Sequence, residues 1–216
     1  MIINSTISLP GDKSISHRSI MLASIASGVS CITNLNDGED LQSTIKAMQS
    51  CGVSIQKEGD TILVKGSTLE NPIKPIDCGN SGTTSRLLAG LLSSQHLSFS
   101  LIGDISLSKR PMNRVIKPLT EMGCMIRSND GLLPLHIDAS KGLDRINYKM
   151  PIASAQVKSA ILLAGLGSKD SCLITELKHS RDHTEIMLKS MGADIKVDGD
   201  NIEVNPLSSA LQSFTM

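Results

Sequence analysis

The feature that most constrains this fold is an internal repeat with a period of about seventy residues. Three glycines mark it, Gly52, Gly123 and Gly192, and each follows an apolar helical pattern such as that of Ile45 and Met48. Two short alternating stretches around a second glycine come next, which predicts a helix, a glycine cap and a β-hairpin. Units of this size must pack their apolar helix faces against one another to bury a core.

The repeat extends upstream of each capped helix, where a short strand and an earlier apolar helix recur. The strands are expected at residues 31–35, 99–103 and 172–176, and the earlier helices at about 16–26, 83–92 and 155–166. The sequence therefore predicts an α/β (α+β) fold of three βαβαββ repeats about a pseudo-threefold axis. Helices are expected inside and sheets outside, in one domain that spans residues 1–216.

A polar loop opens the first helix of each repeat. These loops are residues 13–18, 79–84 and 154–158, and two basic loops, 109–112 and 179–183, precede second helices. Helix N-termini present free backbone N–H groups and the positive end of the dipole, which suits phosphate or carboxylate. Around a threefold axis the loops can converge on a pocket lined by Lys13, Arg18, Arg110 and Arg181. The alternative for each loop is an ordinary capped helix start with surface charges.

The composition restricts what such a pocket can bind. Lysine plus arginine and aspartate plus glutamate each number 21, so the formal net charge is zero. The chain lacks the long-range attraction of a nucleic-acid-binding protein, and Phe99, Tyr148 and Phe214 are its only aromatic residues. No apolar run approaches the ~20 residues of a membrane span. A small ligand with several negative charges is therefore expected, with neither nucleic acid nor membrane as a partner.

The cysteines indicate the compartment. They number five, show no C-x-x-C spacing and follow no disulfide framework, and the N-terminus lacks the pattern of a signal peptide. Reduced thiols in a cytoplasmic protein fit this usage best.

Other motifs are weaker. Residues 11–14 resemble the end of a P-loop, but the upstream glycine of that motif is missing. Ser180, Asp182 and His183 are the residue types of a catalytic triad, yet sequence neighbours do not make one, and Asp182 is interpreted as a helix N-cap. His17 has no second histidine at ligand spacing, so a structural role is expected and no metal site is predicted.

Five stretches together resemble the 3-phosphoshikimate 1-carboxyvinyltransferase (EPSP synthase) family. They occur in the family's order and cover the chain from end to end. The stretches are Leu9 to Arg18, Asp77 to Thr84, Gly103 to Met112, Ser154 to Leu166 and Ser180 to Leu188. The related enolpyruvyl transferase of cell-wall synthesis, which acts on a UDP-sugar, is the nearest alternative, but its opening loop is of a different type.

The resemblance implies a reaction without metal or organic cofactor. The 5-hydroxyl of shikimate 3-phosphate attacks C2 of phosphoenolpyruvate, the methylene carbon is protonated, and the tetrahedral intermediate loses phosphate. The residues that would bind shikimate 3-phosphate are Lys13, Ser14, Arg18, Ser154, Ala155, Gln156 and Arg181. Those that would bind phosphoenolpyruvate are Lys13, Asn80, Gly82, Thr83, Arg110 and Gln156.

The resemblance also implies a second domain. Family members are about twice as long as this chain, and their active site lies between two similar three-repeat domains. The catalytic carboxylates belong to the other domain, so no catalytic residue is assigned here, and the missing C-terminal half is an expected partner. Residues 1–8 and 206–216 are expected to be crossover segments that are poorly anchored in this half. The alternative to half an enzyme is a non-catalytic phosphometabolite-binding fragment.

Overall fold

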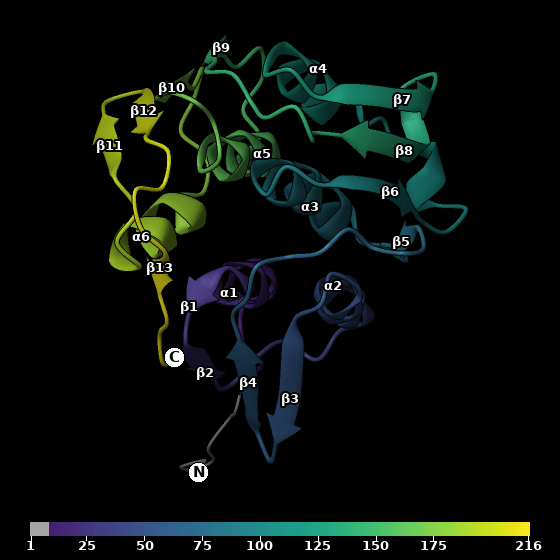
Figure 1. Cartoon of the computed structure of the whole chain (residues 1–216), viewed down its shortest axis with the longest axis vertical. Coiled ribbons are helices and arrows are strands. Elements are labelled where there is room, and N and C mark those ends of the chain that lie inside the picture. Colours follow the sequence, from purple (N-terminus) through teal and green to yellow (C-terminus); the bar gives the residue numbers. More distant parts are fainter. Residues whose placement is uncertain (1–8) are drawn as a thin grey trace, which may run out of the picture.

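The computed structural model describes residues 9–216 and shows three successive α/β units (Figure 1). Residues 1–8, one of the two expected crossover segments, lie outside the described residues. The first unit contains α1 (Lys13–Ser24), β2 (Val29–Ile32), α2 (Glu39–Ser50), β3 (Ser54–Glu58) and β4 (Thr61–Lys65), with a short β1 (Ala26–Ser27) after α1. The second contains β5 (Ile76–Asp77), α3 (Gly82–Ser94), β6 (Ser98–Ile102), a 3₁₀ turn (Leu107–Lys109), α4 (Asn113–Glu121), β7 (Met125–Asn129) and β8 (Leu132–Asp138). The third contains β9 (Asn147–Lys149), α5 (Ala155–Gly165), β10 (Cys172–Thr175), α6 (His183–Ser190), β11 (Ile195–Asp198) and β12 (Asn201–Val204), followed by β13 (Leu211–Gln212).

The three marker glycines end the second helix of each unit as predicted. Gly52, Gly123 and Gly192 have φ angles of 88°, 100° and 94°, in the left-handed region where a residue without Cβ is unstrained. The amide after the first of them, Val53 N, bonds back to Met48 O at 3.2 Å, and the other two units make equivalent bonds. These caps turn the chain directly into the hairpins β3–β4, β7–β8 and β11–β12, all of them antiparallel.

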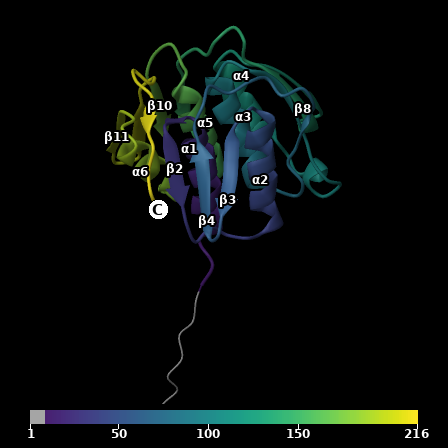
Figure 2. The same ribbon diagram turned by 60° about the horizontal axis from the view of Figure 1, so that its bottom comes forward.

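Each unit places its sheet at the outside of the molecule, in the same strand order. The second sheet runs β5-β6-β8-β7 and the third β9-β10-β12-β11, each with its first two strands parallel. The first sheet, β2-β4-β3, repeats the last three positions of that order. Figures 1 and 2 show the three sheets around a centre of helices, which confirms the predicted arrangement.

The first helices α1, α3 and α5 fill the centre. Nearly every residue of α5 after its first turn is buried, from Val157 to Gly165, because neighbours surround this apolar helix on all sides. Helices α3 and α5 approach so closely that a Cβ on Gly90 would lie 2.0 Å from the carbonyl oxygen of Ala160. Glycine at this position therefore sets the spacing at the core.

The C-terminal segment is held by the first unit, so the expectation that residues 206–216 are poorly anchored is wrong. β13 pairs in parallel with β1, and the chain then runs beside β2. Cys31 N donates to Phe214 O at 3.0 Å, Thr33 N to Met216 O at 2.7 Å, and Met216 N to Cys31 O at 2.9 Å. This segment occupies the edge that β5 and β9 occupy in the other two sheets, so it completes the first one.

Two predicted boundaries shift for local reasons. The first helix begins at Lys13 rather than Ser16, because the Asp12 carboxylate caps it by accepting a bond from Ile15 N at 2.8 Å. The strand expected at residues 31–35 ends at Ile32, because Asn34 takes a positive φ of 49° that breaks the extended backbone.

Candidate functional site

The predicted site residues stand at equivalent positions on three equivalent helices. Asp12, Ser81 and Ser154 are the N-caps of α1, α3 and α5, and each side chain accepts a bond from the backbone N–H three residues on, at 2.8, 3.1 and 3.4 Å. The first two helical residues after each cap are Lys13 and Ser14, Gly82 and Thr83, and Ala155 and Gln156. All six belong to the predicted set, so the repeat itself places them.

One group of these residues joins the first and third repeats. The exposed Arg181, in the loop before α6, donates from Nη1 to the Ser14 hydroxyl at 2.7 Å. Arg18 donates from Nη1 to the carbonyl of the same Ser14 at 2.9 Å. Ser14 is therefore held by a guanidinium on either side.

Arg18 lies beneath the surface rather than in it. It is buried, and its Nε and Nη2 donate to Thr184 and Ser159, each at 2.7 Å. Burial, followed by the nearby Arg181, lowers the pKa of Arg18 to about 10, which still leaves it charged at neutral pH. Its bonds fix α1 against α5 and α6, and its direct contact with a ligand stays a prediction.

A second group joins the second and third repeats. Gln156 Nε2 donates to the Thr83 hydroxyl at 3.0 Å, while Gln156 Oε1 accepts from Arg86 Nη1 at 3.2 Å. Sequence reasoning missed Arg86, although it stands one helical turn beyond Gly82 and bonds to the carbonyl of that glycine at 3.3 Å. Burial, and then Arg110 and Arg114, lower the pKa of Arg86. Such a concentration of like charge favours an anion at this edge.

Arg110 stands in the loop before α4 at the same edge. Its Nη2 donates to Asn80 Oδ1, and Asn80 in turn donates to Asp104 at 2.6 Å. Asp104 also accepts from the backbone of Leu107, and that bond, together with Asn80, lowers the pKa of Asp104. The predicted pair Asn80 and Arg110 is thus brought together and oriented by a carboxylate.

Lys13 stands at the first position of α1, directly before Ser14. Its ammonium pairs with Asp40, at the start of α2, and about half of its side chain is exposed (52%). The carbonyl of Asp40 is 3.4 Å from the Thr84 hydroxyl on α3, which also bonds to Thr44 at 2.7 Å. These contacts tie α1, α2 and α3 together next to the proposed site residues. Of the predicted residues, Ser154 caps the helix with its hydroxyl and makes no other side-chain bond among the described residues, and Ala155 has no hydrogen-bonding group in its side chain.

The structure also shows the surroundings of His17 and Asp182, which belong to the weaker sequence motifs. His17 is fully buried, and its Nδ1 bonds to the Thr44 hydroxyl at 2.7 Å. Burial lowers the pKa of His17 to about 4, so the ring is neutral and structural. Asp182 occupies the N-cap position of α6 as predicted, but its side chain makes no capping bond.

A buried charged cluster next to the loop that holds Arg181 was also missed. Lys158 pairs with Glu176 at 2.9 Å and with Glu185 at 2.6 Å, and all three side chains are almost wholly inaccessible. The signal in the sequence was a lysine inside an otherwise apolar helix, flanked by Val157 and Ser159. Charged side chains are seldom fully buried without a specific reason.

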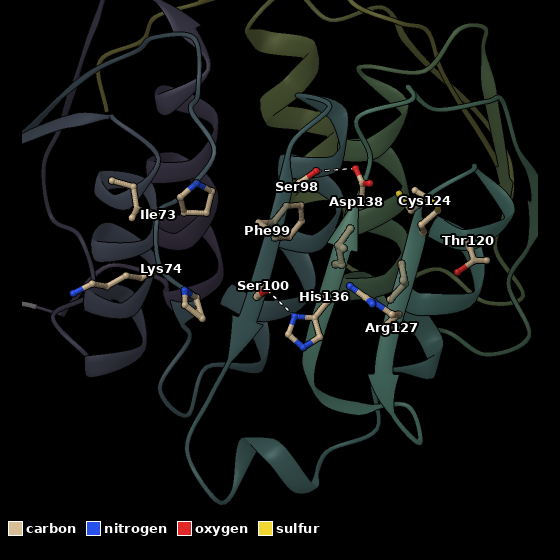
Figure 3. A pocket seen from close by; sticks show the side chains of 15 residues that line it. Ile73, Lys74, Ser98, Phe99, Ser100, Thr120, Cys124, Arg127, His136 and Asp138 are labelled. Carbon is tan, nitrogen blue, oxygen red and sulfur yellow. Dashed lines mark hydrogen bonds between the residues drawn. The ribbon is translucent and has the colours of Figure 1, made fainter.

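A separate groove lies on the outer face of the second sheet (Figure 3). The Ser100 hydroxyl there is 2.8 Å from His136 Nδ1, as in a nucleophile–base pair. The nearby carboxylate of Asp138 accepts instead from Ser98 at 2.7 Å, so it does not orient the histidine. Ser100, His136 and Asp138 therefore do not form a catalytic triad. None of the predicted site residues lines this groove.

Neither a metal cluster nor a membrane span is found in residues 9–216. No group of three or more His, Cys, Asp or Glu side chains within that range could hold a metal ion. None of the helices described there is long and apolar enough to cross a membrane.

Fold and site together define a three-repeat α/β domain in which arginines bond to residues at the starts of α1 and α5. The model of one protein family, EPSP synthase (3-phosphoshikimate 1-carboxyvinyltransferase), matches residues 2–216. The chain belongs to the EPSP synthase family.

Curated relatives and solved structures agree with this assignment. The chain is 51% identical over 203 residues to the 3-phosphoshikimate 1-carboxyvinyltransferase of Ruthia magnifica, with 93% of this chain and 47% of the relative covered. It is 48% identical over 208 residues to that of Oceanobacillus iheyensis, with 94% and 48% covered. A solved EPSP synthase from Acinetobacter baumannii superimposes with a TM-score of 0.92 at 42% identity, covering 97% of this chain and 49% of that one. The chain thus spans about half the length of the curated relatives it matches.

Proposed function

We propose that this chain forms the shikimate 3-phosphate half of an enzyme that transfers the enolpyruvyl group of phosphoenolpyruvate to the 5-hydroxyl of shikimate 3-phosphate. The observation that supports the proposal is the equivalence of the three helix starts, in which Ser14, Thr83 and Gln156 each stand at the second helical position after an N-cap. Arginines bond to two of these residues, Arg18 and Arg181 to Ser14 and Arg86 to Gln156. The names of the relatives supply the reaction, and they favour it over the cell-wall alternative and over a non-catalytic fragment.

The first group is proposed to bind shikimate 3-phosphate. Arg181 is exposed and already donates to the Ser14 hydroxyl, so both groups can turn toward a phosphate or carboxylate at that point. Lys13 can leave Asp40 for the ligand, and Gln156 and the start of α5 can bond to ring hydroxyls. Each charge-assisted bond of this kind is worth about 1.5–3 kcal/mol when partly desolvated.

The second group is proposed to bind phosphoenolpyruvate. Arg110, oriented by Asn80, and Arg86, oriented by Gln156, supply two guanidinium groups for a carboxylate or a phosphate. Because Gly82 has no side chain, the Arg86 guanidinium can lie against the start of α3, where an added Cβ would be 2.5 Å from its Nη1. Fixed cationic donors stabilise the charge that develops on the departing phosphate without reorganising during the reaction.

The remaining parts of the proposal concern the second half of the enzyme. The 5-hydroxyl must lose its proton and the methylene carbon must gain one as the O–C2 bond forms. A proton must then be removed from the resulting methyl group as the C2–O bond to phosphate breaks. No residue of this chain is assigned that task, so a C-terminal domain is the proposed partner. The proposed location is the cytoplasm, in keeping with five cysteines that are all free thiols.

Complementation tests the proposal. The 216-residue chain is mixed with a separately expressed C-terminal half of a relative, and phosphate release from phosphoenolpyruvate is followed with and without shikimate 3-phosphate. Release that needs both halves and both substrates supports the proposal. Binding of a UDP-sugar in place of shikimate 3-phosphate, with no release from the shikimate substrate, would contradict it.

A further inference from the structure

We infer that Lys158 is a positioning residue, which fixes Arg181 in the site by anchoring the loop of residues 176–182 from beneath. The inference rests on the proposed function, because it assigns to a buried group the geometry of one proposed ligand contact. Lys158 itself is not proposed to contact the ligand, since its side chain is only 1% exposed.

The anchor begins on α5. Lys158 Nζ lies 2.9 Å from Glu176 Oε2, at the end of β10, and 2.6 Å from Glu185 Oε1, on α6. The same ammonium is 3.4 Å from the carbonyl oxygen of Ser180. Lys158 therefore contacts Glu176 and Ser180 in the loop that joins β10 to α6, and Glu185 on α6 itself.

Glu176 carries the restraint to the site. Its Oε1 accepts from the backbone N of Ser180 at 3.1 Å and from the Ser180 hydroxyl at 2.6 Å. The next residue is Arg181, whose Nη1 donates to Ser14 at 2.7 Å. A continuous series of bonds thus runs from the core lysine to the guanidinium at the surface.

Comparison of the positions equivalent to Lys158 shows how the third repeat differs from the other two. Counted from the three N-caps, the fourth helical residue is Ser16, Ser85 or Lys158. Ser16 bonds to the backbone of Asp12 and to Asn36 N in the loop before α2, and Ser85 bonds to the backbone of its own helix. Lys158 instead reaches Glu185 on the next helix, α6. In the second repeat Asn80 performs the restraining role by bonding directly to Arg110. Among the described residues, none in the same loop of the third repeat bonds to Arg181 in this way, and this is the repeat that contains Lys158.

Stability alone is a poor explanation for the cluster. Moving two charged side chains out of water costs about as much free energy as their attraction gains. Proteins in which apolar residues replace a buried ion pair are often equally stable. Glu185 Oε2 is buried without a hydrogen-bond partner among the described residues. The cluster is better explained by its effect on the loop, because a defined loop conformation reduces the entropy lost on ligand binding.

The test is a double-mutant cycle on the 216-residue chain, with shikimate 3-phosphate as the probe. The anchor is removed by the pair Lys158→Met and Glu176→Leu, which takes away both the ammonium and the carboxylate that accepts from Ser180. We expect Arg181→Ala to weaken binding about tenfold in the native background and less than about threefold in the anchor variant. A merely structural role would leave the Arg181→Ala effect the same in both backgrounds, and that result would overturn the inference.

A second variant covers the case in which the anchor variant fails to fold. Ser180→Ala removes only the hydroxyl that bonds to Glu176, and it should reduce the Arg181→Ala effect in the same direction. The matched control is Lys169→Met, which removes an exposed lysine that pairs with Asp144 at 2.8 Å, away from the loop. It should leave the Arg181→Ala effect unchanged.

Amide hydrogen exchange of the ligand-free chain separates this inference from the proposed function. The Ser180 amide should exchange at least about tenfold faster when the anchor is removed, with α5 still protected. If the native chain does not bind shikimate 3-phosphate, the proposed function fails while the exchange result still decides the role of Lys158. A Ser180 amide that keeps its protection would refute the positioning role.

Discussion

Arg181 donates from Nη1 to the Ser14 hydroxyl across 2.7 Å, and the two residues are 167 positions apart in the chain. The bond joins the first helix of the first repeat to a loop of the third. The proposed site is therefore held together by contacts between repeats, and no single repeat contains it. The bond from Gln156 to Thr83 likewise joins the third repeat to the second.

The buried His17 should make the chain sensitive to acid. Because burial lowers its pKa from 6.5 to about 4, the unfolded state binds a proton first as the pH falls. The stability due to the neutral ring is present above pH 6.5 and is lost as the pH falls toward 4. Between pH 7 and pH 5 we expect the free energy of unfolding to fall by about 2 kcal/mol from this group. Urea denaturation at the two pH values measures it.

The matched comparison uses a second histidine. His17→Gln should flatten this pH dependence, whereas His136→Gln, a change on the outer face of a sheet, should retain it. Equal losses of stability in all three proteins would show that His17 is not the group responsible.

Leu211 should anchor the C-terminal segment to the first unit. Its side chain is 1% exposed, so Leu211→Ala should lower the free energy of unfolding by about 2–3 kcal/mol. Ile73→Ala, at a fully exposed position, is the control and should change it by less than about 0.5 kcal/mol. Thermal and urea denaturation measure both, and a near-neutral Leu211→Ala would mean that the segment is held only loosely in solution.

Gly82→Ala should act on the proposed phosphoenolpyruvate group. A Cβ at this position would lie 2.5 Å from Arg86 Nη1, so the guanidinium must move away from Gln156. In an enzyme completed by a relative's second half, we expect the KM for phosphoenolpyruvate to rise about tenfold, the effect of one lost charge-assisted bond. The KM for shikimate 3-phosphate is the internal control, and an equal rise in both constants would contradict this assignment.

Gly90→Ala should disturb the core, because the new methyl group would meet the backbone of Ala160. Backbone cannot yield as a flexible side chain does, so we expect a loss of about 3 kcal/mol or more in the free energy of unfolding. Ser50→Ala, at the exposed end of α2, serves as the control. A stability like that of the native chain would show that α3 and α5 can separate without cost.

The repeat made much of this structure predictable. Glycine caps such as Gly52 and the polar helix starts are local signals, so their positions follow from neighbouring residues alone. The burial of Arg18 and the reach of Lys158 to Glu185 could not be predicted in this way, because they depend on how one repeat packs against another. The anchorage of Phe214 beside Cys31 was missed for the same reason, since its edge becomes available only when the whole domain closes.

The central claim is that the chain holds a shikimate 3-phosphate half-site built from convergent helix starts, and titration calorimetry of the isolated 216-residue chain tests it most directly. We expect measurable binding of shikimate 3-phosphate that weakens about tenfold in Arg181→Ala, with phosphate release from added phosphoenolpyruvate staying at background. No binding by the native chain, or equal binding by Arg181→Ala, would contradict the claim.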